Sequence, residues 1–259
     1  MDDIQSSPDC RGIPIECVGI TDLVYPITVL DRDNEKQDTI GTFSMSVNLP
    51  HHFKGTHMSR FVEVLNEYDN VFTGAMMPLV LASLMSKFEA ESATIEVSFP
   101  YFITKHAPVT KTRGIMNYEC TFKAESTLQG YDFILTTAVP VTSLCPCSRE
   151  ISSNGAHNQR GTIKIDVRFT DQKKIVWIEE LVDIAEASAS APVYSLLKRP
   201  DEKHLTEIAY DNPVFVEDMV RNVTQQLKKD DRISWFRVEA KNQESIHNHN
   251  AFAVIEWKD

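Results

Sequence analysis

The sequence has no apolar run long enough to cross a membrane, for which a helix needs about 20 residues. Its first five residues lack the basic start and the apolar core of a signal peptide. A long basic run is also missing, and the formal net charge is -11. Binding of nucleic acid over an extended surface is therefore disfavoured, and an anionic ligand would need a local cluster of lysine and arginine.

Cysteine is scarce: the 259 residues contain five, an odd number. A disulfide framework is therefore disfavoured, and a reducing cytoplasm is the expected location. Hydrophobic residues make up 42% of the chain and charged residues 24%, as in ordinary soluble globular proteins. The length is enough for one large domain or two small ones.

The first half of the chain predicts the order strand, strand, helix, helix, strand, strand. Residues 39–47 alternate between apolar and polar side chains, which is typical of a half-buried strand. Ser59 is expected to cap the first helix, and Pro78 marks the start of the second. The other strands are expected at 22–30, 95–99 and 115–122.

The same order recurs after the turn at Gln129-Gly130. Asn212 followed by Pro213 is a typical helix start. The remaining elements are expected at 132–141, 162–169, 178–185, 235–240 and 251–257. Strand pairs with helices between them favour an α+β fold with antiparallel sheets. We therefore expect two modules, residues 1–129 and 130–259.

Two neighbouring polar segments, 143–148 and 155–160, carry Cys145, Cys147 and His157. The Cys-x-Cys spacing fits neither a zinc-finger knuckle nor a Cys-x-x-Cys redox site. One thiolate could act as a metal ligand or nucleophile, with His157 arriving from the following segment. The alternative is that the cysteines are small residues at the end of a strand.

A separate polar segment near the C-terminus, 245–250, contains His247 and His249. In a strand these two side chains would project from the same face. Neighbouring imidazoles can bind a divalent ion or relay protons. The alternative is a pair of satisfied polar side chains without function.

The polar segment 197–204 has two interpretations. It is either a solvated charged loop or a segment whose side chains bind a metal or phosphate. Glu202 supplies a carboxylate, and Arg199 and Lys203 could contact phosphate. The segment 53–60 is similar, because it places basic side chains about a helix N-terminus, which receives anions readily.

Glu217 and Asp218 are expected in the first turns of a helix, where acidic side chains favour the helix dipole without any function. Glu217 borders the apolar face and is expected to be partly buried. Such a carboxylate can also hold the adjacent N–H donors of a guanine or pterin edge. The residues alone leave both interpretations open.

These segments together resemble the type IB GTP cyclohydrolases. The matching motifs are KGTHMSRF (54–61), SLCPCS (143–148), GAHNQR (155–160), LKRPDE (197–202), FVED (215–218) and SIHNH (245–249). The resemblance implies a tunnelling fold (T-fold) with two ββααββ modules per chain. It further implies a homotetramer whose barrels carry active sites at subunit interfaces.

The resemblance also implies a catalytic divalent metal (zinc, manganese or iron(II)) and no organic cofactor. The implied ligands are Cys145, His157, Glu202 and His247, and Cys147 could replace Cys145. Glu217 takes the place of the glutamate that anchors the purine. The basic residues available for the triphosphate are Lys54, His57, Arg60, Arg160, Arg199 and Lys203.

The implied reaction converts GTP and water to 7,8-dihydroneopterin triphosphate and formate, the first step of tetrahydrofolate biosynthesis. A metal can lower the pKa of water to about 7, which suits attack at guanine C8. We assign His249 as proton donor to N7, although His247 could exchange roles with it. The catalytic residues are then Cys145, Cys147 and His249.

Two other functions stay open. One is the nitrile reductase of queuosine synthesis, another tunnelling-fold enzyme, which needs a cysteine nucleophile and NADPH but no metal. The other is a non-catalytic purine-binding or metal-binding protein. The sequence leaves open whether the product phosphate is linear or cyclic.

Overall fold

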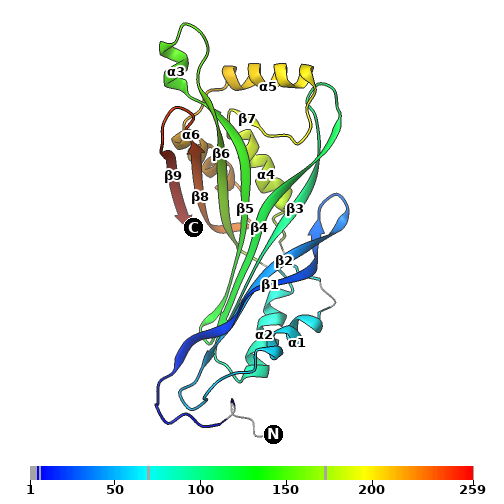
Figure 1. Cartoon of the computed structure of the whole chain (residues 1–259), viewed down its shortest axis with the longest axis vertical. Coiled ribbons are helices and arrows are strands. Elements are labelled where there is room, and N and C mark those ends of the chain that lie inside the picture. Colours follow the sequence, from blue (N-terminus) through cyan, green and yellow to red (C-terminus); the bar gives the residue numbers. More distant parts are fainter. Residues whose placement is uncertain (1–4, 6, 69–70, 172–173, 259) are drawn as a thin grey trace. The chain divides into compact units, whose positions relative to one another are not determined.

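The computed structural model describes residue 5 and residues 7–68, 71–171 and 174–258 (Figure 1). The chain divides into two compact units. Unit 1 comprises Met1–Phe99 and Thr121–Leu135, and unit 2 comprises Pro100–Cys120 and Thr136–Asp259. In the described part of the chain, no helix has both the length and the apolar character that membrane crossing requires.

Unit 1 is an antiparallel sheet with two helices. Its elements are β1 (Ile15–Asp31), β2 (Glu35–Leu49), α1 (Ser59–Asn66), α2 (Met77–Phe88) and the unit-1 parts of β3 (Ala93–His106), β4 (Arg113–Thr127) and β5 (Gly130–Leu144). The predicted alternation of β2 is confirmed, since Phe43, Met45 and Val47 are buried. The two helices pack together through Phe61 and Phe88, whose ring centroids lie 4.4 Å apart.

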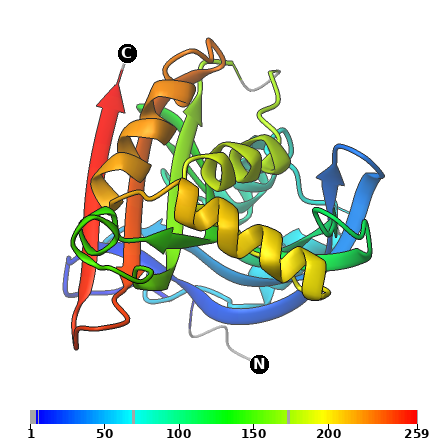
Figure 2. The same ribbon diagram turned by 90° about the horizontal axis from the view of Figure 1, so that it is seen from above.

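Unit 2 continues with the remaining parts of β3, β4 and β5, and the strand order there is β3-β4-β5-β6-β8-β9, with β7 paired to β5. Its further elements are α3 (Pro146–Ile151), β6 (Asn158–Phe169), α4 (Ile178–Ala187), β7 (Ala191–Pro192), α5 (Arg199–Asp211), α6 (Val216–Leu227), β8 (Ile233–Gln243) and β9 (Asn250–Lys258). Figure 2 shows α6 alongside β8 and β9. The predicted apolar face of α6 is confirmed, because Met219, Val220 and Val223 are buried.

The order of elements in the first half of the chain is the predicted one. The second half adds α3, β7 and α5 to the predicted strands and helices. The segment 197–204, which could be read as a loop, instead enters α5. Pro200 stands in its first turn, and the Asp201 carboxylate accepts a hydrogen bond from the Lys198 amide at 3.0 Å. Both features favour helix initiation.

Two predicted helix starts are wrong in detail. Ser59 is the first helical residue, whereas the cap position belongs to Met58 and makes no side-chain hydrogen bond. Asn212 is the C-cap of α5, and α6 begins only at Val216. The reason is that the Asp218 carboxylate accepts a hydrogen bond from the Phe215 amide at 3.1 Å, which fixes the start three residues later.

An ion pair lies inside unit 2 between β3 and α4. Lys105 Nζ lies 2.7 Å from Glu186 Oε1, and the two side chains are only 12% and 13% exposed. The Tyr118 hydroxyl donates to the same carboxylate at 3.0 Å. Burial, with the negative charge of Glu186 beside it, raises the pKa of Tyr118 above its ordinary range. This cluster joins α4 to the sheet through charged groups.

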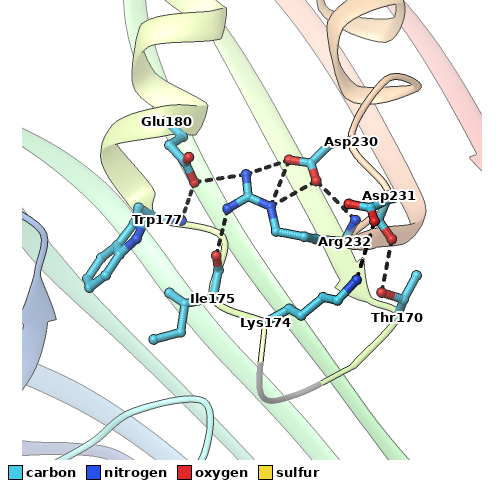
Figure 3. Close-up of polar contacts among 8 residues, drawn as sticks. All are labelled: Thr170, Lys174, Ile175, Trp177, Glu180, Asp230, Asp231 and Arg232. Carbon is cyan, nitrogen blue, oxygen red and sulfur yellow. Dashed lines mark hydrogen bonds and ion pairs between the residues drawn. The ribbon is translucent and has the colours of Figure 1, made fainter.

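A second polar cluster holds the start of α4 against the turn before β8 (Figure 3). The Arg232 guanidinium donates to Asp230 Oδ1 at 2.8 Å and to the Ile175 carbonyl at 2.8 Å. It also lies 3.1 Å from Glu180 Oε2. Hydrogen bonds from Arg232 hold the pKa of Asp230 below its usual range, although burial opposes this shift. One guanidinium therefore connects three chain segments.

Candidate functional site

Cys145 lies where β5 passes into α3. It is the N-cap of that helix, and Pro146 occupies the first turn. The Ser148 amide donates to Cys145 Sγ at 3.5 Å, and the Cys145 amide donates to the His157 carbonyl at 3.1 Å. Cys145 is half-buried, whereas Cys147 is exposed. The predicted proximity of the segments that carry Cys145 and His157 is thus present in the fold.

His157 immediately precedes β6, and two side chains contact its ring. Its Nδ1 lies 2.8 Å from Gln159 Oε1 and 3.5 Å from Ser245 Oγ. Ser245 belongs to the bend between β8 and β9, which also carries the two predicted histidines. The structure therefore brings the bend next to the segment of Cys145 and His157.

His247 and His249 lie side by side in that bend. Their rings are stacked, with centroids 5.0 Å apart and an interplanar angle of 14°. Both residues are exposed. The segment is a bend, not a strand, yet the two imidazoles are neighbours.

Glu202 lies in the first turn of α5, which Figure 1 shows at the same end of unit 2 as α3. The preceding Asp201 is 0% exposed. It accepts hydrogen bonds from the amides of Val109 and Thr110, at 2.8 and 2.9 Å. Burial opposes ionisation of Asp201, but these hydrogen bonds outweigh it and lower its pKa well below the usual range. Asp201 thus fixes the turn that carries Glu202.

A cavity of about 600 Å³ lies between α5 and the segment before His157. Its lining includes Ala156, Asn158, Thr206 and Tyr210. Arg160 lines a smaller cavity of about 210 Å³, which also contacts Asn158 and Thr206. The two cavities therefore share Asn158, the first residue of β6.

The predicted substrate residues are mostly at the surface. Lys54, Arg199 and Lys203 are exposed, and Lys203 lies 3.7 Å from Glu207. Glu217 is exposed, so its expected partial burial is wrong: the apolar face of α6 turns inward through Val216 and Val220, and Glu217 lies beside it.

Two further predicted phosphate contacts, His57 and Arg60, lie at the start of α1. Both are half-buried, and Arg60 donates to the Lys87 carbonyl at 3.0 Å. The Arg60 amide also donates to the His57 carbonyl at 3.1 Å.

The four predicted metal ligands do not gather within one chain. Among the described residues, no three histidine, cysteine, aspartate or glutamate side chains form a group able to hold a metal ion. The sequence interpretation also assigned no role to Gln159, Glu244 or Ser245. Gln159 could have been found, because it stands two positions after His157 and a strand places such residues on one face.

Residues 1–253 match the family model described as Type I GTP cyclohydrolase folE2. The chain belongs to this family. Relatives named GTP cyclohydrolase FolE2 are 53% identical in Geobacter sp. (strain M21) and 52% identical in Syntrophobacter fumaroxidans. The first alignment covers 99% of this chain and 94% of the relative, and the second covers 99% of both.

Solved structures of two urate oxidases are similar in fold. Urate oxidase from Bacillus subtilis 168 has a TM-score of 0.56 at 10% identity, over 93% of this chain and 98% of the other. Uricase from Arthrobacter globiformis has a TM-score of 0.55 at 7% identity, over 94% and 93%. The predicted α+β class with an antiparallel sheet is confirmed, and these neighbours identify the fold as a urate oxidase-like tunnelling fold.

Proposed function

We propose that this chain is a GTP cyclohydrolase I that converts GTP and water to 7,8-dihydroneopterin triphosphate and formate in folate biosynthesis. The observation that carries the proposal is the family match over residues 1–253. It agrees with the fold, which sets the segments of Cys145, His157 and the histidine bend beside one another. GTP is the substrate, and the cytoplasm is the proposed location.

Cys145, His157, Glu202 and His247 would hold a divalent metal. Thiolate and imidazole together suit zinc or iron(II), and the carboxylate also suits manganese. Cys145 is preferred over Cys147 as the metal ligand because its backbone amide donates a hydrogen bond to the His157 carbonyl. When bound, the ion would supply an activated water for hydrolysis at guanine C8.

The remaining proposed roles belong to side chains that contact the nucleotide. Glu217 would accept the adjacent N–H donors of the guanine edge, since an ionised carboxylate only accepts hydrogen bonds. His249 would donate a proton to guanine N7, with His247 next to it at 5.0 Å between ring centroids. Lys54, His57, Arg60, Arg160, Arg199 and Lys203 form the pool from which the triphosphate contacts would come.

An oligomer would complete this site. Each proposed ligand is exposed or half-buried in the single chain, and no described group of three could hold an ion. We propose, from the repeated order of elements and the family resemblance, two ββααββ modules per chain that close barrels in a homotetramer. Active sites at the interfaces would then combine residues from neighbouring chains.

The deciding assay uses metal-stripped protein supplied in turn with zinc, manganese and iron(II), following formate release and pterin fluorescence from GTP. Formate restored by one ion, together with a pterin that fluoresces after oxidation, supports the proposal. Binding of GTP without formate under every ion would contradict it and leave a binding protein. NADPH oxidation with a nitrile substrate would favour the reductase instead.

A further inference from the structure

Gln159 is a buried polar side chain of unit 2, at 8% exposure. Its amide lies between two partners from different parts of the fold. Oε1 is 2.8 Å from His157 Nδ1, and Nε2 is 3.5 Å from Glu244 Oε1. Glu244 immediately precedes the bend that carries His247 and His249. The amide therefore joins the start of β6 to the start of that bend.

The chemistry of these partners fixes the direction of both hydrogen bonds. An ionised glutamate can only accept, so the amide NH2 of Gln159 must face Glu244. Oε1 then faces His157 and can only accept, so Nδ1 of that imidazole must carry the proton. Ser245 Oγ also approaches Nδ1, but at 3.5 Å it is the weaker partner.

We propose that Gln159 is a positioning residue for His157 and holds its imidazole in the Nδ1–H tautomer, with the Nε2 lone pair available to a metal. The inference rests on the proposed ligand role of His157. Metal-binding histidines usually donate their other ring N–H to a supporting group, which fixes both tautomer and ring orientation. A buried amide oriented by a carboxylate is such a group.

The link to Glu244 extends this role to the bend. Glu244 is half-buried and continues β8, whose neighbouring Asn242 is paired with Gly161 of β6. Because β6 and β8 are adjacent strands, the hydrogen bond from Gln159 to Glu244 continues their connection beyond the last backbone pair. Gln159 thereby holds the segment of His157 and the entrance to the histidine bend in one arrangement.

The first test measures the tautomer of His157 by ¹⁵N NMR in metal-free protein at about pH 8, where an ordinary histidine is neutral. We expect the Nδ1–H form in the native chain and a mixture of tautomers in Gln159→Met. The double variant Gln159→Glu with Glu244→Gln exchanges the two side chains. The new carboxylate at position 159 still accepts from His157, and the new amide at position 244 donates to it. This variant should therefore recover the Nδ1–H form. An unchanged tautomer in folded Gln159→Met overturns the proposal.

The second test measures zinc affinity, with Thr162→Val, an exposed change on β6, as control. We expect Gln159→Met to weaken zinc binding by about 10- to 100-fold, the usual effect of losing a supporting residue. The double variant should recover most of this loss. If Gln159→Met does not fold, Glu244→Ala, which frees the amide to rotate, should shift the tautomer in the same direction. No shift in that variant would count against the proposal.

His157→Ala separates this inference from the proposed function. If His157→Ala leaves zinc affinity unchanged, the ligand role is wrong, and with it the claim that Gln159 supports a ligand. If His157→Ala loses zinc but Gln159→Met retains it with a native tautomer, the ligand role stands and the positioning role fails.

Discussion

The two compact units bury different kinds of side chain. Among the described residues, the buried polar side chains of unit 1 are Asp31 and Thr56. Those of unit 2 are Thr137, Ser143, Gln159, Asp166, Glu179, Ser188, Ser190, Asp201 and Asn242. Unit 1 is thus held mainly by apolar packing, whereas unit 2 also depends on buried hydrogen bonds. Buried polar groups are costly unless satisfied, so they accumulate where they position other groups. In this chain that is the unit containing Cys145, His157 and Glu202.

The largest expected effect lies at the polar site of unit 2. Cys145→Ser should lower GTP turnover by more than about 100-fold, the upper range for loss of a merely supporting residue. Zinc affinity and formate release are measured together, beside Cys147→Ser. The exposed Cys17→Ser serves as control. Native turnover in Cys145→Ser with a loss in Cys147→Ser would reassign the thiolate.

The apolar core of unit 1 should give the largest stability loss. Phe43 is 0% exposed and contacts Phe72, at 5.0 Å between ring centroids. Phe43→Ala should cost about 3–5 kcal/mol, because transfer and cavity terms add. Urea denaturation of the metal-free protein measures this, and a loss below about 1 kcal/mol would show that unit 1 collapses around the cavity.

The ion pair of unit 2 should respond differently from such a core. Lys105→Met leaves the Glu186 carboxylate, whose side chain is 13% exposed, without its cationic partner and should cost about 3 kcal/mol. Adding Glu186→Leu should recover much of this loss, since an apolar pair removes the uncompensated charge. Denaturation of the two variants tests the idea. If the double variant is no more stable than the single one, the Tyr118 hydroxyl, left without its acceptor, limits recovery.

A smaller effect is expected at Asp201 and depends on pH. The folded pKa is lowered from the ordinary 3.8, so the carboxylate contributes stability above that value. The contribution is lost as the pH falls through the folded pKa. The stability difference between the native chain and Asp201→Asn should therefore be largest near neutrality and shrink in acid. A difference independent of pH would mean that shape, not charge, makes Asp201 useful.

The smallest effect is expected where α3 meets α5. The Arg149 guanidinium lies over the Tyr210 ring, 4.7 Å from its centroid. Arg149→Gln should cost about 0.5–1 kcal/mol, as is usual for an exposed cation–π contact. Thermal denaturation beside Tyr210→Leu checks it, and additive losses in the double variant would show that the two side chains do not interact.

The contrast between apolar packing and buried polar contacts also explains which elements could be predicted from the sequence. Strands such as β2 and helices such as α6 bury one regular face, so their period is visible in the sequence. Helix α5 buries only Asp201 and Ala209, which leaves no apolar stripe to detect. Its charged first turn therefore resembles a loop.

The candidate site, like the fold, was predicted only in part. Motifs located Cys145 and His157, and the fold sets their segments together. The contact between Gln159 and Glu244 depends on how β6 pairs with β8, which local sequence does not specify. Glu202 and His247 form no metal-binding group with Cys145 and His157 among the described residues, and local sequence carries no information on such long-range proximity.

The division of the chain into two units limits how the protein can be truncated or tagged. The backbone passes from one unit to the other at residues 99–100, 120–121 and 135–136, each time inside a strand. No single cut therefore yields an intact half, and a truncated fragment would begin or end with a severed strand. A reporter or affinity tag is better inserted at the exposed hairpin tip of Leu128, where the chain turns without leaving unit 1. A chimera that takes one whole unit from a relative would likewise have to exchange two separate segments at once.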